Sequence, residues 1–149
     1  MVTNRNSAHL PAPHSPPQFR VLIVDDNATV RTGLRAVLQE EGYLVIEAPD
    51  GVVALDILRA LPYGVVVLCD HSMPRLDGPG LLRRVQAEPD VANRHVYIYM
   101  TAATRLISPE LQGLLTALDA PRLGKPFTID AVLEAVERGA RRLARDVGA

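Results

Sequence analysis

The chain has 149 residues, which is enough for one domain with a substantial core and hardly for two. Its 16 basic and 17 acidic residues nearly balance, so the net charge of −1 indicates no general affinity for nucleic acid or for an anionic membrane. No apolar run reaches the roughly 20 residues of a membrane span, and the single cysteine, Cys69, excludes an internal disulfide, so we expect a cytoplasmic protein.

Residues 1–18 differ in composition from the rest of the chain. They hold four of its twelve prolines and show no apolar periodicity, which predicts a flexible, partly extended tail. They also lack the apolar core of a secretory signal. His9 and His14 lie in this segment, and we interpret them as solvated residues and not as metal ligands. The single domain is expected over residues 19–146.

From Arg20 onward, short apolar runs alternate with apolar residues at helical spacing. The predicted strands cover residues 20–24, 43–48, 64–69, 95–100 and 121–124. Helices are predicted after the first four strands at residues 28–42, 51–61, around 81–85 and over 108–118, and after the fifth over 128–143. Their expected N-terminal caps include Asn27, Asp50, Ser108 and Thr128.

The last helix is predicted to be amphipathic. Its inward face is expected to carry Ile129, Val132, Leu133, Val136, Ala140 and Leu143. Its outer face carries acidic and basic residues together, namely Glu134, Glu137, Arg138, Arg141, Arg142 and Arg145. Because both signs of charge alternate there, we interpret this face as solvated and not as a nucleic-acid patch.

Five strand-then-helix units in strict alternation predict an α/β fold, with a parallel sheet covered by helices on both faces. The third and fourth strands are continuously apolar, as strands covered on both sides should be. For the common strand order 2-1-3-4-5, a binding site is expected at the switch point between the first and third strands. That site would be built by the residues just after Val24 and just after Cys69.

Carboxylates occupy both of those positions. Asp25 and Asp26 follow the first strand, and Asp70 follows the third. Three converging acids repel one another unless some are protonated or a cation lies among them. A divalent ion that prefers oxygen ligands, most simply Mg²⁺, would relieve the repulsion. The alternative is that each acid is only a turn or cap residue.

Two further groups complete a constellation suited to a phosphoryl group. Thr101 ends the fourth strand and supplies a hydroxyl. Lys125 follows the fifth strand and is the only lysine among 16 basic residues, which indicates a position that requires a compact ammonium. The cations would offset phosphoryl charge and the hydroxyl would donate to an oxygen. With Asp70 as the nucleophile, the product would be an aspartyl phosphate.

The segments "VLIVDDN", "LCDHSMPRLDG", "YMTA" and "LGKPF", in this order, resemble the receiver domain of two-component response regulators. The resemblance covers roughly residues 20–146. It implies that Asp70 accepts a phosphoryl group from the phosphohistidine of a sensor kinase or a phosphotransfer protein. It also implies that Asp26, Asp70 and the backbone carbonyl of Ser72 bind Mg²⁺ directly, with Asp25 acting largely through water.

The resemblance assigns roles to other positions as well. Thr101 would move to bond a phosphoryl oxygen and Lys125 would pair with it. In many such domains the proline at the position of Pro126 follows a cis peptide bond. Asp77 and Gly78 would form the turn into the third helix.

Some positions depart from the family's usual pattern. Arg122 stands where an aromatic residue is usual, so we do not expect the usual coupling between threonine and aromatic to transmit the signal. Thr101 and Lys125 lie 24 residues apart, slightly more than usual, which indicates an altered fourth helix or loop. Ser72 and Ala103 occupy the positions that tune the lifetime of the phosphoryl group. Because neither is suited to orient an attacking water, we expect slow self-dephosphorylation.

The remaining candidates are interpreted as structural. Cys69 is expected in the core, His71 as a loop histidine and His95 as a residue without a function of its own. Tyr97 and Tyr99 are expected to pack within the fourth strand, although one of them could take over part of the missing aromatic's role.

The predicted function is a phosphorylation-controlled signalling switch and not an enzyme with a separate substrate. No output domain is expected after residue 146, so the chain would bind a partner or pass its phosphoryl group onward. In relatives the surface of the fourth helix, fifth strand and fifth helix carries partner or dimer contacts, and a homodimer is possible here. Two alternatives stay open: an adaptor that works without phosphorylation, and an aspartyl-nucleophile phosphatase. Against the phosphatase, Ser72 stands where a second acid would be needed.

Overall fold

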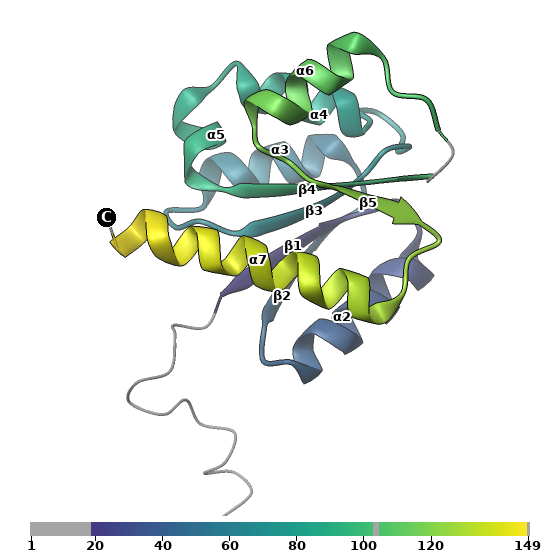
Figure 1. Cartoon of the computed structure of the whole chain (residues 1–149), viewed down its shortest axis with the longest axis vertical. Coiled ribbons are helices and arrows are strands. Elements are labelled where there is room, and N and C mark those ends of the chain that lie inside the picture. The colour runs from purple at the N-terminus through teal and green to yellow at the C-terminus, as the bar shows by residue number, and fades with distance from the viewer. Residues whose placement is uncertain (1–18, 103–104, 149) are drawn as a thin grey trace, which may run out of the picture.

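The computed structural model describes residues 19–102 and 105–148 and shows a sheet between two layers of helices (Figure 1). The predicted tail, residues 1–18, and Ala103 lie outside the described residues. In chain order the elements are β1 (Arg20–Val24), α2 (Ala28–Glu40), β2 (Leu44–Ala48), α3 (Gly51–Ala60), β3 (Val66–Asp70), α4 (Gly78–Gln86), α5 (Pro89–Arg94), β4 (Val96–Ala102), α6 (Pro109–Ala117), β5 (Arg122–Lys125) and α7 (Ile129–Gly148).

All pairs of neighbouring strands are parallel, and the order β2-β1-β3-β4-β5 confirms the prediction. The register brings the carboxyl ends of the strands to one edge. Val24 lies opposite Cys69, Asp70 opposite Met100, and Thr101 opposite Gly124. Asp25, which follows β1, and Asp70, the last residue of β3, are therefore neighbours in space, as the switch-point argument requires.

Alternate residues of each strand feed two separate hydrophobic clusters. On one face, Leu22 and Val24 of β1 pack with residues of α3, α4, α5 and α6. On the other face, Val21 and Ile23 pack with residues of α2 and α7. Every residue of β3 is buried, which explains its continuous apolar run. The sheet is thus a rigid base for its carboxyl edge.

Side-chain caps fix the beginnings of the helices. Asn27, Asp50 and Ser108 accept bonds from backbone N–H groups of α2, α3 and α6, as predicted. Asp77 caps α4 in the same way. Thr128 Oγ1 accepts from the Ala131 N–H at 3.1 Å at the start of α7.

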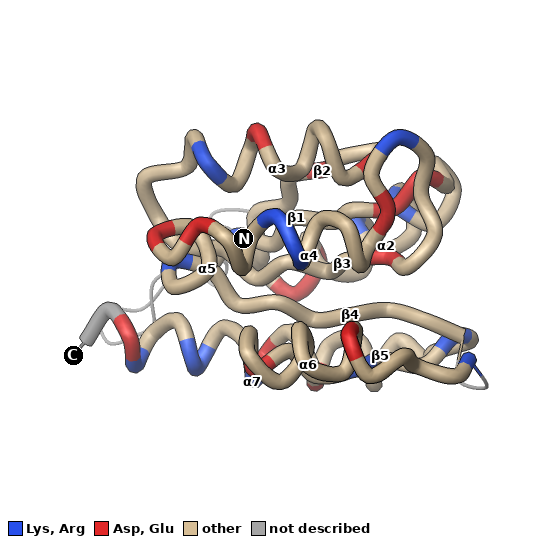
Figure 2. Tube along the Cα trace, turned by 90° about the horizontal axis from the view of Figure 1, so that it is seen from above, with Lys and Arg blue, Asp and Glu red and all other residues tan. Residues whose placement is uncertain are grey.

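Two details differ from the sequence prediction. The short helix α5 was not predicted, because six residues that include Pro89 do not repeat an apolar face. Ile129 does not face inward: as the first residue of α7 it is 59% exposed, and burial begins only at Val132. The outer face of α7 is solvated as expected, with basic and acidic positions lying together (Figure 2) and ion pairs within it. Within the described residues, no helix is long and apolar enough to cross a membrane.

Candidate functional site

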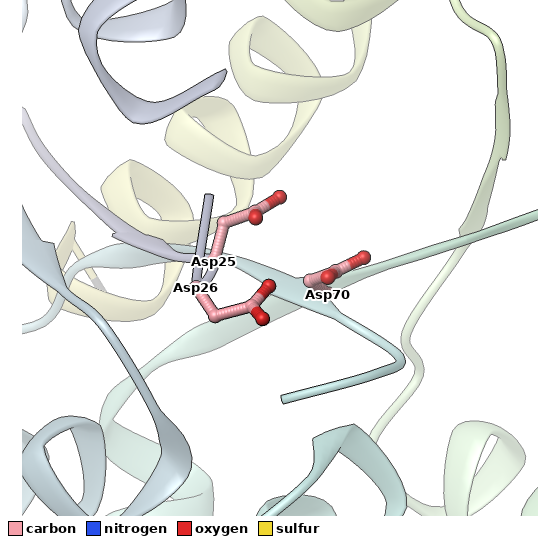
Figure 3. Close-up of side chains that lie close together, drawn as sticks. All are labelled: Asp25, Asp26 and Asp70. Atoms are coloured by element: carbon pink, nitrogen blue, oxygen red, sulfur yellow. The ribbon is translucent and has the colours of Figure 1, made fainter. Parts of the chain in front are cut away.

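Asp25, Asp26 and Asp70 converge at the carboxyl edge of the sheet and are called the acid cluster below (Figure 3). One carboxylate oxygen from each lies within 4.8 Å of the others. Asp25 and Asp70 are buried, at 1% and 7% exposure, whereas Asp26 is exposed. The sequence predicted this convergence from the fold alone.

Backbone bonds hold the turn after β1. The Asp25 N–H donates to the Ala48 carbonyl at 3.2 Å, and Asp25 Oδ1 accepts from the Asn27 N–H at 2.9 Å. Arg31 reaches back from α2 and donates from Nη1 to the Asp25 carbonyl at 2.6 Å. The carboxylate of Asp25 is therefore fixed in place before any ligand arrives.

Lys125 joins two members of the acid cluster. Its Nζ lies 2.6 Å from Asp70 Oδ1 and 3.3 Å from Asp25 Oδ2. It stands at the end of β5, and the peptide bond from Lys125 to Pro126 is cis, as the resemblance implied. An ammonium thus lies beside the carboxylate that was predicted to be the nucleophile.

The charges in the site perturb one another. Burial raises the pKa of Asp70 above its ordinary value, and the charge of Asp25 adds to this, while the bond from Lys125 opposes it. Burial alone would lower the pKa of Lys125. The bonds and charges of Asp70 and Asp25 outweigh that effect, so its pKa lies above the ordinary value and the ammonium is stabilised.

Thr101 presents an unused hydroxyl. Its side chain is buried, and in the described part of the chain no group forms a hydrogen bond with Oγ1. A buried hydroxyl without a partner is uncommon, because its desolvation is then uncompensated. Thr101 lines a pocket of about 360 Å³ with the acid cluster, Lys125 and Ser72; we call it the acid pocket.

The donor set of the acid pocket fits a divalent ion that prefers oxygen. It offers three carboxylates, and their close-packed negative charges need compensation. Mg²⁺ typically binds one or two carboxylates and fills its shell with water and phosphate oxygens. The acid cluster could hold such an ion.

Several residues around the pocket were not predicted to contribute. Arg105 lines the acid pocket and adds a second cation, a role that no sequence pattern signals. The buried Tyr99 hydroxyl is bonded to His71 Nδ1, and the two rings meet edge to face. His71 was predicted to be only a loop residue. The bond joins the segment after β3 to the strand that carries Thr101.

Other candidate residues lie where the sequence predicted. Cys69 and Tyr97 are buried in the core. His95 is buried too and bonded only to backbone groups within the described chain. Arg122 is exposed on β5 and lines a second groove, of about 670 Å³, between α6, β5 and α7. It therefore lies outside the acid pocket.

The chain is similar to known proteins along most of its length. Residues 21–137 match the model of the response regulator receiver domain. The response regulator MprA of Mycobacterium sp. strain KMS is 36% identical over 129 residues, which is 87% of this chain and 54% of the relative. MprA of Mycolicibacterium paratuberculosis is 36% identical over 83% of this chain and 52% of its own length. The chain thus spans about half the length of the curated relatives it matches.

Solved structures share the fold. The chemotaxis protein CheY4 of Vibrio cholerae matches with a TM-score of 0.68 and 28% identity, over 82% of this chain and 98% of the other. A CheY-like receiver domain protein of Methanospirillum hungatei matches with a TM-score of 0.70 and 25% identity, over 87% and 98% of the two chains.

Proposed function

The chain belongs to the family of response regulator receiver domains of two-component systems, and on that premise we propose that it is a signalling switch controlled by phosphorylation of Asp70. One observation carries the proposal. The ammonium of Lys125 lies 2.6 Å from Asp70, in the same pocket as the hydroxyl of Thr101, which has no hydrogen-bond partner among the described residues. This arrangement supports the proposal, because a carboxylate, an ammonium and a hydroxyl line one pocket that a phosphoryl group would fill.

The proposed reaction is a transfer between two protein side chains. An oxygen of the Asp70 carboxylate attacks the phosphorus of a phosphohistidine. The bond between phosphorus and nitrogen breaks, and the imidazole leaves with the electron pair and takes up a proton. The product is an acyl phosphate on Asp70. No separate substrate is turned over, so the chain acts as a phosphoacceptor and not as an enzyme in the usual sense.

Other residues of the acid pocket serve that transfer. Asp26, Asp70 and the Ser72 carbonyl would hold Mg²⁺, with Asp25 acting largely through water. When bound, the ion would offset the charge of the carboxylates and of the incoming phosphoryl oxygens. Lys125 would pair with one phosphoryl oxygen. The Thr101 hydroxyl would donate to another, which would satisfy its unused bonding capacity.

The proposed partners are a sensor histidine kinase or phosphotransfer protein, and a downstream protein. For the downstream partner we favour the face formed by α6, β5 and α7, which carries the groove of about 670 Å³. The same face would serve a homodimer. Arg122 is exposed on this face where relatives usually carry an aromatic residue, and this favours a second candidate function, an adaptor that binds without phosphorylation.

The test is phosphorylation by a small donor. The protein is incubated with Mg²⁺ and acetyl phosphate, and its intact mass is measured. We expect a gain of one phosphoryl group, which disappears when Mg²⁺ is omitted and in an Asp70→Asn variant. Asp56→Asn is the matched control, because Asp56 is an exposed carboxylate on α3 outside the acid pocket. A wild-type protein that neither gains mass nor binds Mg²⁺ would refute the phosphoacceptor and favour the adaptor.

A further inference from the structure

The loop between β3 and α4, residues 71–77, contains a residue in a backbone conformation that side chains disfavour. Arg75 has a φ of 65°, in the left-handed region, which raises the free energy of a non-glycine residue. The Leu76 N–H donates to the Pro74 carbonyl at 2.7 Å, so the chain turns sharply here. Such a conformation persists only where surrounding contacts hold it. Those contacts come from the N-terminus of α3.

Asp50, the N-cap of α3, binds the side chain of Arg75. The Nε and Nη2 atoms of Arg75 both donate to Asp50 Oδ2, at 3.0 and 2.5 Å. The other oxygen of Asp50 accepts from the Val53 N–H at 3.0 Å. Next to this pair, the Gly51 N–H donates to the Leu76 carbonyl at 3.0 Å. Two consecutive residues at the start of α3 are therefore bonded to two consecutive residues of the loop.

The carboxylate of this pair is buried, although its partner is not. The Asp50 side chain is 6% exposed and that of Arg75 is 58% exposed. Burial alone would raise the pKa of Asp50, yet the bonds from Val53 and Arg75 hold it below its ordinary value. The backbones approach closely as well, since a Cβ on Gly51 would lie 2.4 Å from the Leu76 carbonyl oxygen. Asp50 is thus a fixed anchor for the guanidinium.

The other end of the same loop lines the acid pocket. His71 and Ser72 both belong to its lining. The His71 N–H donates to the Met100 carbonyl at 3.0 Å, and the His71 carbonyl accepts from the Gly78 N–H at 2.9 Å. Ser72 lies between this fixed point and Arg75. Its backbone carbonyl is the one metal ligand that this loop is proposed to contribute.

We propose that Arg75 is a positioning residue for the metal site: its ion pair with Asp50 fixes loop 71–77, and with it the Ser72 carbonyl, relative to the acid cluster. This inference rests on the proposed function, because it assumes that the acid cluster binds Mg²⁺. Mg²⁺ demands nearly ideal octahedral geometry, so a ligand on a loosened loop binds it more weakly. Replacing a residue that orients a metal ligand without touching the metal typically weakens metal affinity by about 10- to 100-fold.

The test is a calorimetric titration of Mg²⁺ into the wild type and an Arg75→Ala variant, with the unfolding free energy of each measured without Mg²⁺. We expect the dissociation constant for Mg²⁺ to rise about tenfold in the variant. Arg59→Ala is the matched control, because the Arg59–Glu88 pair has the same 2.5 Å separation and lies outside the acid pocket. Its dissociation constant should stay within about twofold of the wild type.

Further variants separate the ion pair from the backbone strain. Arg75→Gly removes the guanidinium but adopts a positive φ freely, so it should lose as much Mg²⁺ affinity as Arg75→Ala while keeping more stability. Asp50→Asn keeps an oxygen to cap the Val53 N–H but removes the charge, and should weaken Mg²⁺ binding by a similar factor. In a double variant that combines Arg75→Ala with Asp50→Asn, the two losses of Mg²⁺ affinity should not add.

Equal losses in the alanine and glycine variants, with the Arg59 control unchanged, would support the inference. If the wild type binds Mg²⁺ and both Arg75 variants bind it within about twofold as well, Arg75 serves stability alone. That result overturns the inference and leaves the proposed function standing. Wild-type affinity in Arg75→Gly but not in Arg75→Ala would assign the effect to the backbone and also overturn it. A wild type that neither binds Mg²⁺ nor accepts a phosphoryl group overturns both.

Discussion

Lys125 is the only lysine among the 16 basic residues of the chain, and its surroundings explain why arginine would not serve. Its ammonium lies between two buried carboxylates, 2.6 Å from Asp70 and 3.3 Å from Asp25. A compact ammonium can donate to both from one nitrogen, whereas a planar guanidinium is larger and donates in a fixed fork. Arginines make pairs with single carboxylates instead, as Arg59 does with Glu88 and Arg83 with Glu110.

His95 makes two hydrogen bonds that require one neutral tautomer. The Val65 N–H donates to Nδ1 at 3.1 Å, so Nδ1 carries no proton. Nε2 lies 3.1 Å from the Leu58 carbonyl and must donate to it. Burial lowers the pKa of His95, the charge of Arg94 lowers it further, and the bond to Leu58 opposes both. A second proton on Nδ1 would face the Val65 N–H.

We therefore predict that His95 makes folding sensitive to acid. The pKa of His95 in the folded chain lies below the unfolded value near 6.5. Neutral His95 therefore makes its full contribution to the unfolding free energy above that pH. This contribution is lost as the pH falls through the unfolded pKa towards the folded one, by at most about 1.4 kcal/mol per pH unit. His95→Gln should be less stable at pH 7 by about 1 kcal/mol but should lose less stability between pH 7 and pH 5.

Denaturant unfolding at a series of pH values measures the difference between the two curves. His71 has a lowered pKa as well, through burial above all, but it is present in both proteins and its effect cancels. Parallel curves for wild type and variant would mean that the pKa of His95 is the same in the folded and the unfolded chain, and would contradict the prediction.

At the scale of elements, the start of α4 packs directly on the end of β3. A Cβ added to Gly78 would lie 2.4 Å from the Asp70 carbonyl oxygen and 3.1 Å from the Tyr99 ring. Since the first atom belongs to the backbone, relief requires α4 or the residues around Asp70 to move. The helix that follows the loop is thus part of what fixes the predicted nucleophile.

Gly78→Ala is predicted to lower the unfolding free energy by about 2 kcal/mol, as overpacking typically does. It should also slow phosphorylation by acetyl phosphate, because Asp70 is displaced. Gly113→Ala is the control: Gly113 is exposed on α6 with nothing within 4 Å of its added Cβ, so it should gain about 0.5–1 kcal/mol. Denaturant unfolding of both variants decides, and a stabilised Gly78→Ala would be the contrary result.

The sequence predicted the elements that have a repeating apolar pattern and missed a helix that has none. Apolar periodicity and caps located the strands and the longer helices, and the parallel order then brought Asp25 next to Asp70. The helix α5 was not predicted, because it has no repeating apolar face. The ion pair of Arg75 with Asp50 was not predicted either. It depends on how a loop packs against a helix that is distant in sequence, and no sequence pattern indicates such packing.

At the scale of the whole molecule, charge repulsion within the acid cluster at the carboxyl edge of the sheet opposes folding. The hydrophobic clusters on both faces of the sheet hold the strand ends in place. That rigidity keeps three carboxylates within 4.8 Å of one another, although they repel. Lys125 offsets part of the repulsion through its contacts with Asp25 and Asp70. The remainder lowers stability, as is common where function requires charges to be held together.

If the acid cluster binds Mg²⁺ as proposed, the ion is expected to stabilise the folded chain, because the cluster is assembled only in the folded state. At 100 times its dissociation constant, a ligand adds about 2.7 kcal/mol, or roughly 5–10 °C in the unfolding midpoint for a chain of this size. Asp26→Asn should reduce this shift, and because Asp26 is exposed, the variant should be at least as stable as the wild type without Mg²⁺. Thermal unfolding monitored by circular dichroism at constant ionic strength measures both effects. If NaCl at the same ionic strength raised the midpoint as much as Mg²⁺, the stabilisation would be general screening, and the acid cluster would not be a metal site.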